Sequence, residues 1–151
     1  MNQEKRPGGL TALAVINFVF FGFSIIGLLG LVITYVGIIP TEQMTEEQRA
    51  PIEALQNMSL PVFISIFLLS VTASVLLLLS GIGYLQQKKI MGWGLGNLYA
   101  IISIVNSIIS ILFFTSEMAG GGFTISTIID LIYPVLTLFL LNTTFKDDLT
   151  N

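Results

Sequence analysis

Residues 127–137 read Thr-Ile-Ile-Asp-Leu-Ile-Tyr-Pro-Val-Leu-Thr and lie inside an apolar run that covers residues 123–141. Asp130 is the only ionisable acid or base inside any long apolar run of this chain. Pro134 follows four positions later and has no N–H, so a helix through this stretch leaves the carbonyl of Asp130 without its usual donor. One helical turn therefore offers a carboxyl group and an unpaired backbone oxygen at nearly the same depth.

The whole chain has the composition of a membrane protein. Its 151 residues are 54% hydrophobic and only 10% charged, with a mean hydropathy of +0.89, whereas about a quarter of the residues in soluble domains are charged. Apolar runs of about 18 or more residues indicate membrane spans, and four such runs cover residues 10–39, 62–85, 92–114 and 123–141. The sequence therefore predicts one domain, an all-α integral membrane four-helix bundle.

The first two spans are joined by the only sizeable polar segment, residues 40–61. Thr45 and Gln48 have the spacing of a capping box, which satisfies N–H groups at the start of a helix. Apolar residues beyond them recur on one side of a helical wheel, which predicts a short amphipathic helix on the membrane surface or over the bundle. This helix either forms a cap or partner-docking surface, or it connects two spans and shields its apolar side.

The basic residues are divided unequally between the two sides of the predicted membrane. One side carries Lys5, Arg6, Lys88, Lys89 and Lys146, and the other carries Arg49 alone. Because cytoplasmic loops carry the excess of Lys and Arg, both termini and the turn at Lys88 are predicted to be cytoplasmic, with segment 40–61 outside. Tyr84 and Trp93 flank that turn at the depth where aromatic rings favour the membrane interface.

Contacts between helices in lipid are expected at small and hydrogen-bonding residues. Small residues at helical spacing predict a smooth contact face on the first span, at Gly27, Gly30, Thr34 and Gly37. Small or polar residues predict one contact face on each later span. On the second span these are Ser70 and Ser74, and on the third Tyr99, Ser103, Asn106 and Ser110. On the fourth they are Ser126, Asp130, Tyr133 or Pro134, and Thr137. Asn17 and Asn97 lie nearer the cytoplasmic ends, and each is predicted to form an inter-helix hydrogen bond.

Depth matching gives Asp130 its predicted neighbours. It lies about 10 Å in from the outer end of its span, level with Asn106, Ser107 and Ser110 on the antiparallel third span, and Ser70 falls at a comparable level. No basic residue shares the membrane interior, so burial favours the neutral acid, which donates a hydrogen bond to Asn106 or a hydroxyl. The predicted polar cluster comprises Asp130, Asn106, Ser107, Ser110 and Pro134. A structural hydrogen bond, contact with another subunit, and an ion or proton site all remain open for it.

The chain has no cysteine and no histidine. Disulfides, thiolate nucleophiles, Fe–S clusters, metal sites built from Cys or His, and a histidine general base are therefore excluded. The one acid in the membrane cannot form an aspartyl dyad, and no nucleophile with a matching base is present. We therefore predict no catalytic, cofactor or metal site and no nucleic-acid partner.

Three parts of the chain carry a family resemblance. They are residues 6–18 (RPGGLTALAVINF), residues 81–85 and 88–93 (GIGYL, KKIMGW), and residues 132–134 and 140–146 (IYP, LLNTTFK). These segments resemble a broad set of small bacterial four-span membrane proteins of no established function. The resemblance covers most of the chain and implies a four-helix membrane fold in a bacterial inner membrane. It implies no catalytic or binding residue.

Two functions are compatible with these features. The first is a non-enzymatic accessory or structural subunit of a membrane complex, with the lipid bilayer and other membrane subunits or a second copy of the chain as partners. The alternative is a small transporter or channel component in which Asp130, the unpaired carbonyl before Pro134, and Asn106 bind an ion or a proton.

Overall fold

The computed structural model describes residues 8–42, 44–117 and 125–149, and omits the side chains of Glu47, Ser110 and residues 112–117 and 125–130. Every element in these ranges is a helix. The helices are α1 (Gly8–Tyr35), α2 (Glu46–Gln56), α3 (Leu60–Leu85), η1 (Lys89–Gly94), α4 (Leu95–Glu117) and α5 (Ile125–Thr143). The predicted all-α fold is therefore confirmed.

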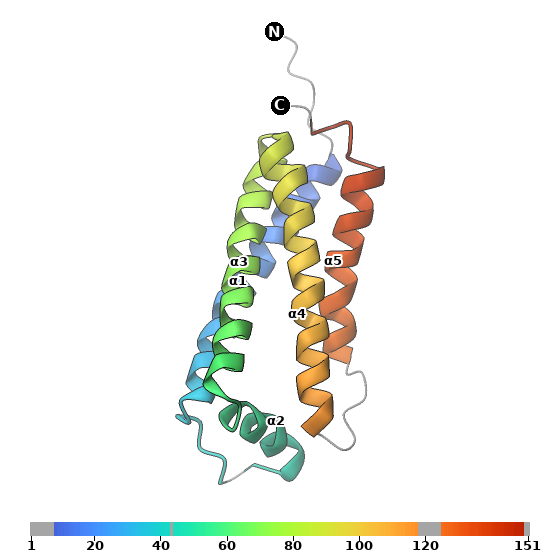
Figure 1. The fold of residues 1–151 in the computed structure, drawn as a ribbon. Coiled ribbons are helices and arrows are strands. Elements are labelled where there is room, and N and C mark those ends of the chain that lie inside the picture. Colours follow the sequence, from blue (N-terminus) through green and yellow to red (C-terminus); the bar gives the residue numbers. More distant parts are fainter. Residues whose placement is uncertain (1–7, 43, 118–124, 150–151) are drawn as a thin grey trace.

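The long helices lie side by side, with α3, α4 and α5 in sequence order and α1 behind them (Figure 1). At one end of the bundle α1 begins, α3 meets η1 and α5 ends, and we call it the turn end. The helix α1 starts there next to α5 and crosses to the back of α3. The short helix α2 lies across the opposite end, which we call the α2 end, where it contacts α1 and α4.

Three helices in the described ranges are long and apolar enough to cross a membrane. They are Gly8–Tyr35, Leu60–Leu85 and Lys89–Ile109, the last formed by η1 and most of α4. The described side chains of α5 contribute a shorter apolar stretch, Leu131–Thr143. These three candidate spans indicate a membrane protein, and the four-span arrangement stays a prediction.

The helix bounds differ from the predicted spans by up to four residues at several ends, and two of these differences have a clear structural cause. The first helix ends at Tyr35 instead of residue 39, and Gly37 behind it has a φ of +79°, a left-handed conformation that glycine adopts without strain. The third span begins at Lys89 instead of residue 92, because residues predicted as a turn form the π-helix η1. Its Gly92 packs against the backbone of α3 at Gly83, where a β-carbon on Gly83 would overlap Gly92.

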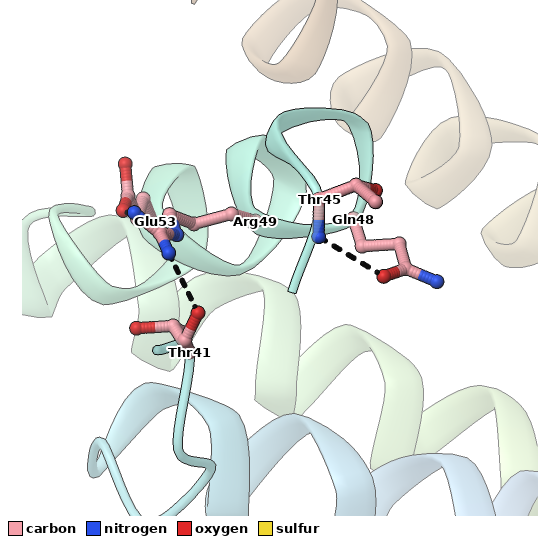
Figure 2. Close-up of polar contacts among 5 residues, drawn as sticks. All are labelled: Thr41, Thr45, Gln48, Arg49 and Glu53. Atoms are coloured by element: carbon pink, nitrogen blue, oxygen red, sulfur yellow. Dashed lines mark hydrogen bonds and ion pairs between the residues drawn. The ribbon is translucent and has the colours of Figure 1, made fainter. Parts of the chain in front are cut away.

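The predicted amphipathic helix of the first loop is present as α2. Thr45 is its N-cap, and the Thr45 backbone N–H donates to the Gln48 side-chain oxygen at 3.3 Å. Arg49 donates to the Thr41 carbonyl at 2.9 Å and lies 3.8 Å from the Glu53 carboxylate (Figure 2). Because this ion pair is exposed, it adds little stability, and the bond to Thr41 is what ties α2 to the end of the first connection.

The two clusters of buried core residues lie in the half of the bundle next to the turn end, while Leu55, Phe63 and Ile66 are buried toward the α2 end. One group contains Leu10, Leu13, Ala14, Tyr84, Leu141, Phe145 and Leu149, and a second contains Leu76, Leu77, Tyr99, Ala100 and Tyr133. Tyr84, which was predicted at the depth of the membrane interface, has a fully buried side chain, and its depth in a membrane stays a prediction. The side chain is buried because Gly92 and Gly96 have no side chains at the positions that its ring and hydroxyl occupy.

The predicted contact face on the first span is also wrong within this chain. A β-carbon added at Gly27 or Gly30 would meet no atom within 4 Å, and Thr34 donates to the Gly30 carbonyl of its own helix at 2.8 Å. The helix α1 instead contacts α3 through a different side, nearer the turn end. There Asn17 and Phe18 of α1 lie against Gly81 of α3.

Candidate functional site

The most extensive polar contact between described helices is centred on Asn17 of α1, which is fully buried. Its Nδ2 donates to the Ser80 hydroxyl at 2.8 Å and to the Leu77 carbonyl at 3.1 Å, both on α3. Its Oδ1 accepts a hydrogen bond from the Tyr133 hydroxyl of α5. One amide side chain therefore joins three helices, and the prediction that Asn17 forms an inter-helix hydrogen bond is confirmed.

Two further buried hydroxyls surround this amide. The Tyr84 hydroxyl lies against Ser80 and Asn17, and the Thr137 hydroxyl lies next to that of Tyr133. Neither hydroxyl makes a hydrogen bond to any residue that the structure describes. We call Asn17, Ser80, Tyr84, Tyr133 and Thr137 the Asn17 cluster.

Aromatic and small residues enclose the Asn17 cluster. The ring of Phe20 meets the Tyr133 ring edge-on at 4.6 Å, and the Tyr99 ring lies 6.3 Å from it. Gly96 of α4 faces the Tyr84 hydroxyl and the Leu141 side chain of α5. Because aromatic rings and aliphatic side chains exclude water, hydrogen bonds within the cluster are costly to leave unmade.

Depth matching placed Asn106 and Ser70 at the level of Asp130, and the structure brings these two residues together. Asn106 of α4 donates through Nδ2 to the Ser70 hydroxyl of α3 at 3.2 Å, which confirms that these two residues lie level. The Asn106 Oδ1 is buried and accepts no hydrogen bond from the described residues. Ser107 is half-buried, and Pro134 is buried within α5.

The other two members of the predicted cluster, Asp130 and Ser110, have side chains that lie outside the described residues. The backbone of Asp130 belongs to α5, four positions before Pro134, as predicted. Its contact with Asn106, Ser107 or Ser110 stays a prediction.

A second asparagine pair joins α4 and α5 nearer the turn end. Asn142 donates through Nδ2 to the Asn97 Oδ1 at 2.6 Å, and Asn97 donates to the Trp93 carbonyl at 2.8 Å. The predicted inter-helix role of Asn97 is confirmed. Because Asn142 is exposed, this bond is weaker support for the fold than the bonds of Asn17.

Sequence reasoning placed Asn17 correctly but missed its partners. Tyr133 and Thr137 were singled out as a polar face of the fourth span, and Tyr84 as an interfacial ring. The same depth matching, applied from the turn end, pairs Asn17, nine residues after Gly8, with Tyr133, ten residues before Thr143. Helix lengths therefore contained the signal for this contact.

The Asn17 cluster consists of neutral hydrogen-bonding groups. Among the described residues no group of three or more His, Cys, Asp or Glu side chains lies together as a metal site would require. Amide and hydroxyl groups at this position can align helices or hold a small polar molecule. They contain no strong nucleophile or base for covalent chemistry.

Replacing Asn17 by leucine, which has a similar volume, should destabilise the bundle by about 1–3 kcal/mol. The substitution removes three inter-helix hydrogen bonds, each worth about 0.6–1.7 kcal/mol within a membrane, and leaves Tyr133 without an acceptor. Unfolding by SDS in mixed micelles measures the difference. Asn142→Ala is the control, expected to cost under about 0.5 kcal/mol because its bond is exposed; equal losses for both variants would contradict a central role for Asn17.

No protein-family model, curated protein or solved structure matches this chain. Function must therefore be inferred from the chemistry of the buried polar groups and from the surfaces that the helices leave uncovered. The buried amide and hydroxyl groups are suited to aligning helices. The exposed surface of α1 is the feature that is open to contact with another molecule.

Proposed function

We propose that this chain is a non-enzymatic, four-span protein of a bacterial inner membrane that serves as an accessory or structural subunit of a membrane assembly. The observation that carries the proposal is the exposure of α1. In an apolar 18-residue stretch of α1 only 6% of the residues are buried, against 28% for α3 and 22% for the span Lys89–Ile109. The longest span is thus the one that the bundle encloses least.

The exposed part of α1 combines small and large apolar residues. A β-carbon added at Gly27 or Gly30 would have no neighbouring atom within 4 Å. The adjacent apolar side chains are also exposed, Ile26 to 67% and Leu29 to 60%. A helix surface that only contacts lipid has no need of glycine, which costs about 1 kcal/mol relative to alanine in a helix. Membrane helices place such residues where another backbone approaches, so this surface fits the helix of another subunit.

The interior polar groups support the same role. Asn17 bonds α1 to α3 and α5, Asn106 bonds α4 to α3, and Asn142 bonds α5 to α4. These contacts hold the chain's own helices in fixed positions, and a subunit that scaffolds an assembly needs that rigidity.

A photo-crosslinking amino acid at Gly30 should give one adduct of defined mass in native membranes, whereas the same probe at Ile132, an exposed position on α5, should give none. Gly30→Leu should abolish a stoichiometric partner in detergent pull-downs without unfolding the chain, because nothing in the bundle occupies that space. Ile132→Leu serves as the matched control. An adduct of twice the chain's mass identifies a second copy as the partner, and recovery of the chain alone with no adduct would refute the proposal.

We propose the orientation with both termini and the turn end in the cytoplasm and α2 outside, since Lys88 and Lys89 are exposed at the turn end and Arg49 is on α2. The chain lacks cysteine, so single-cysteine variants report cleanly. A cysteine at Glu53 should react with a membrane-impermeant maleimide in intact spheroplasts, and one at Gln86 only after lysis. The reverse pattern, or reaction of both from one side, would overturn this orientation.

The alternative function is that of an ion- or proton-coupled transporter or channel component. It is favoured by α5, where Tyr133, Pro134 and Thr137 are buried on one side and Asp130 precedes Tyr133 by three positions. It is also favoured by the buried Oδ1 of Asn106, which has no donor among the described residues. An intramembrane acid near such an acceptor is a candidate proton or cation site.

Proton uptake into proteoliposomes, reported by an enclosed pH-sensitive dye, tests this alternative. If Asp130 carries the proton, purified wild type should show uptake above empty liposomes, and Asp130→Asn should reduce it at least tenfold. Asp147→Asn, which alters an exposed carboxylate after α5, is the matched control and should leave uptake unchanged. Equal uptake by wild type and Asp130→Asn, or none by either, would remove the transport hypothesis.

A further inference from the structure

A short segment after α5 turns back over the turn end of the bundle. Residues 144–149, which we call the closing segment, lead from the end of α5 toward the start of α1 and η1 (Figure 1). The Phe145 N–H donates to the Leu140 carbonyl at 2.9 Å, and the Asp148 N–H donates to the Phe145 carbonyl at 3.2 Å. Both bonds stay within this part of the chain, so hydrogen bonding does not attach the closing segment to the other described helices.

Two apolar side chains attach the closing segment to the bundle. Phe145 is 9% exposed, and its ring fills the space beside Gly9 of α1, where a β-carbon would overlap the ring. Leu149 is 1% exposed and lies against Gly92 of η1. Because glycine has no side chain, each of these spaces accepts a large apolar group. The closing segment is therefore packed into the bundle and does not simply lie over it.

The apolar contacts of the closing segment lead directly to Tyr84. The two inserted side chains belong to the same buried group as Tyr84. A β-carbon placed on Gly92 would lie 2.9 Å from the Leu149 side chain and 3.2 Å from the Tyr84 ring, so these two side chains meet at Gly92. The Tyr84 side chain extends from there to Gly96, one helical turn deeper, where its hydroxyl lies against Asn17.

The closing segment lies between the Asn17 cluster and the edge of the bundle. Gly9, which contacts Phe145, precedes Asn17 by eight residues of α1, or about 12 Å. Lys88 and Lys89 are exposed at this end, which indicates that it borders the aqueous phase. Without the closing segment, the spaces beside two glycines would be open between that phase and Tyr84.

We propose that the closing segment is a seal that closes the turn end of the bundle and keeps water from the Asn17 cluster. Its two apolar side chains fill the spaces beside the glycines, while Lys146 and Asp147 between them are exposed. Hydrogen bonds stabilise a fold more where water cannot compete for their donors and acceptors. The seal therefore strengthens the contact that Asn17 makes between α1, α3 and α5. The inference is independent of the proposed subunit role.

A cysteine inside the Asn17 cluster tests the seal, since the chain has no cysteine of its own. The Ser80 side chain is fully buried, so Ser80→Cys should react slowly with a small charged methanethiosulfonate in membranes whose two faces are both accessible. Adding Leu149→Asn should raise the rate by about tenfold or more, because an amide is costly to hold in the apolar space beside Gly92. Asp147→Asn, an exposed change in the same segment, is the matched control and should leave the rate unchanged.

A second cysteine separates a lost seal from general loosening of the fold. Ser74 of α3 is also buried and lies further from the turn end than Ser80. Ser74→Cys should therefore stay unreactive when Leu149→Asn is added. Equal acceleration at both cysteines, or a Ser80→Cys rate that Leu149→Asn does not change, would overturn the proposal.

Stability measurements separate a seal from a simple anchor. If the closing segment excludes water, Leu149→Asn already lets water compete for the hydrogen bonds of Asn17. The fall in the unfolding midpoint caused by Asn17→Leu should then be about half as large, or smaller, in the Leu149→Asn background as in the wild type. If the segment only anchors the helix ends, the two effects should add, and additivity would contradict the seal.

Discussion

The bundle depends on the buried amide of Asn17. In lipid a polar side chain must find partners within the protein, because no solvent is available to satisfy it. Asn17 meets this requirement only where α3 presents Ser80 and the Leu77 carbonyl and α5 presents Tyr133. These bonds fix the rotation of α1 about its own axis and bring the chain's first and last helices together. Apolar packing alone leaves that rotation poorly determined, since lipid replaces any apolar neighbour at little cost.

Glycine has the complementary role of letting the helices approach. Gly83 and Gly92 bring the backbones of α3 and η1 into contact, and Gly96 leaves room for the Tyr84 hydroxyl. These contacts lie at the turn end, together with both core groups. Toward the α2 end α1 keeps contact with α3 through the stacked rings of Tyr35 and Phe63, 3.7 Å apart, but its glycines are open. Packing is therefore tight at one end and sparse along much of α1.

The difference between predicted and observed features follows from this division. Length and hydropathy predicted where helices lie along the chain, and depth matching correctly placed Asn106 level with Ser70. Neither indicates which side of an apolar helix faces its neighbours. The helix α1 is apolar all round, so Gly27 and Gly30 were assigned to an internal contact that Asn17 and Gly81 make instead. The burial of Tyr84 was missed for the same reason, since Gly92 and Gly96, which leave room for its side chain, belong to other helices.

The distribution of contacts also bears on the choice between a rigid subunit and a transporter. Alternating access moves one group of helices against another around a central site. Here such a movement between α1 and α5 would break the Tyr133–Asn17 bond, and one between α3 and the η1–α4 span would separate Gly83 from Gly92. Each step would expose buried donors or backbone to lipid. Rigid attachment at the turn end, with an uncovered α1 surface, is therefore better suited to holding a neighbouring helix than to opening a path.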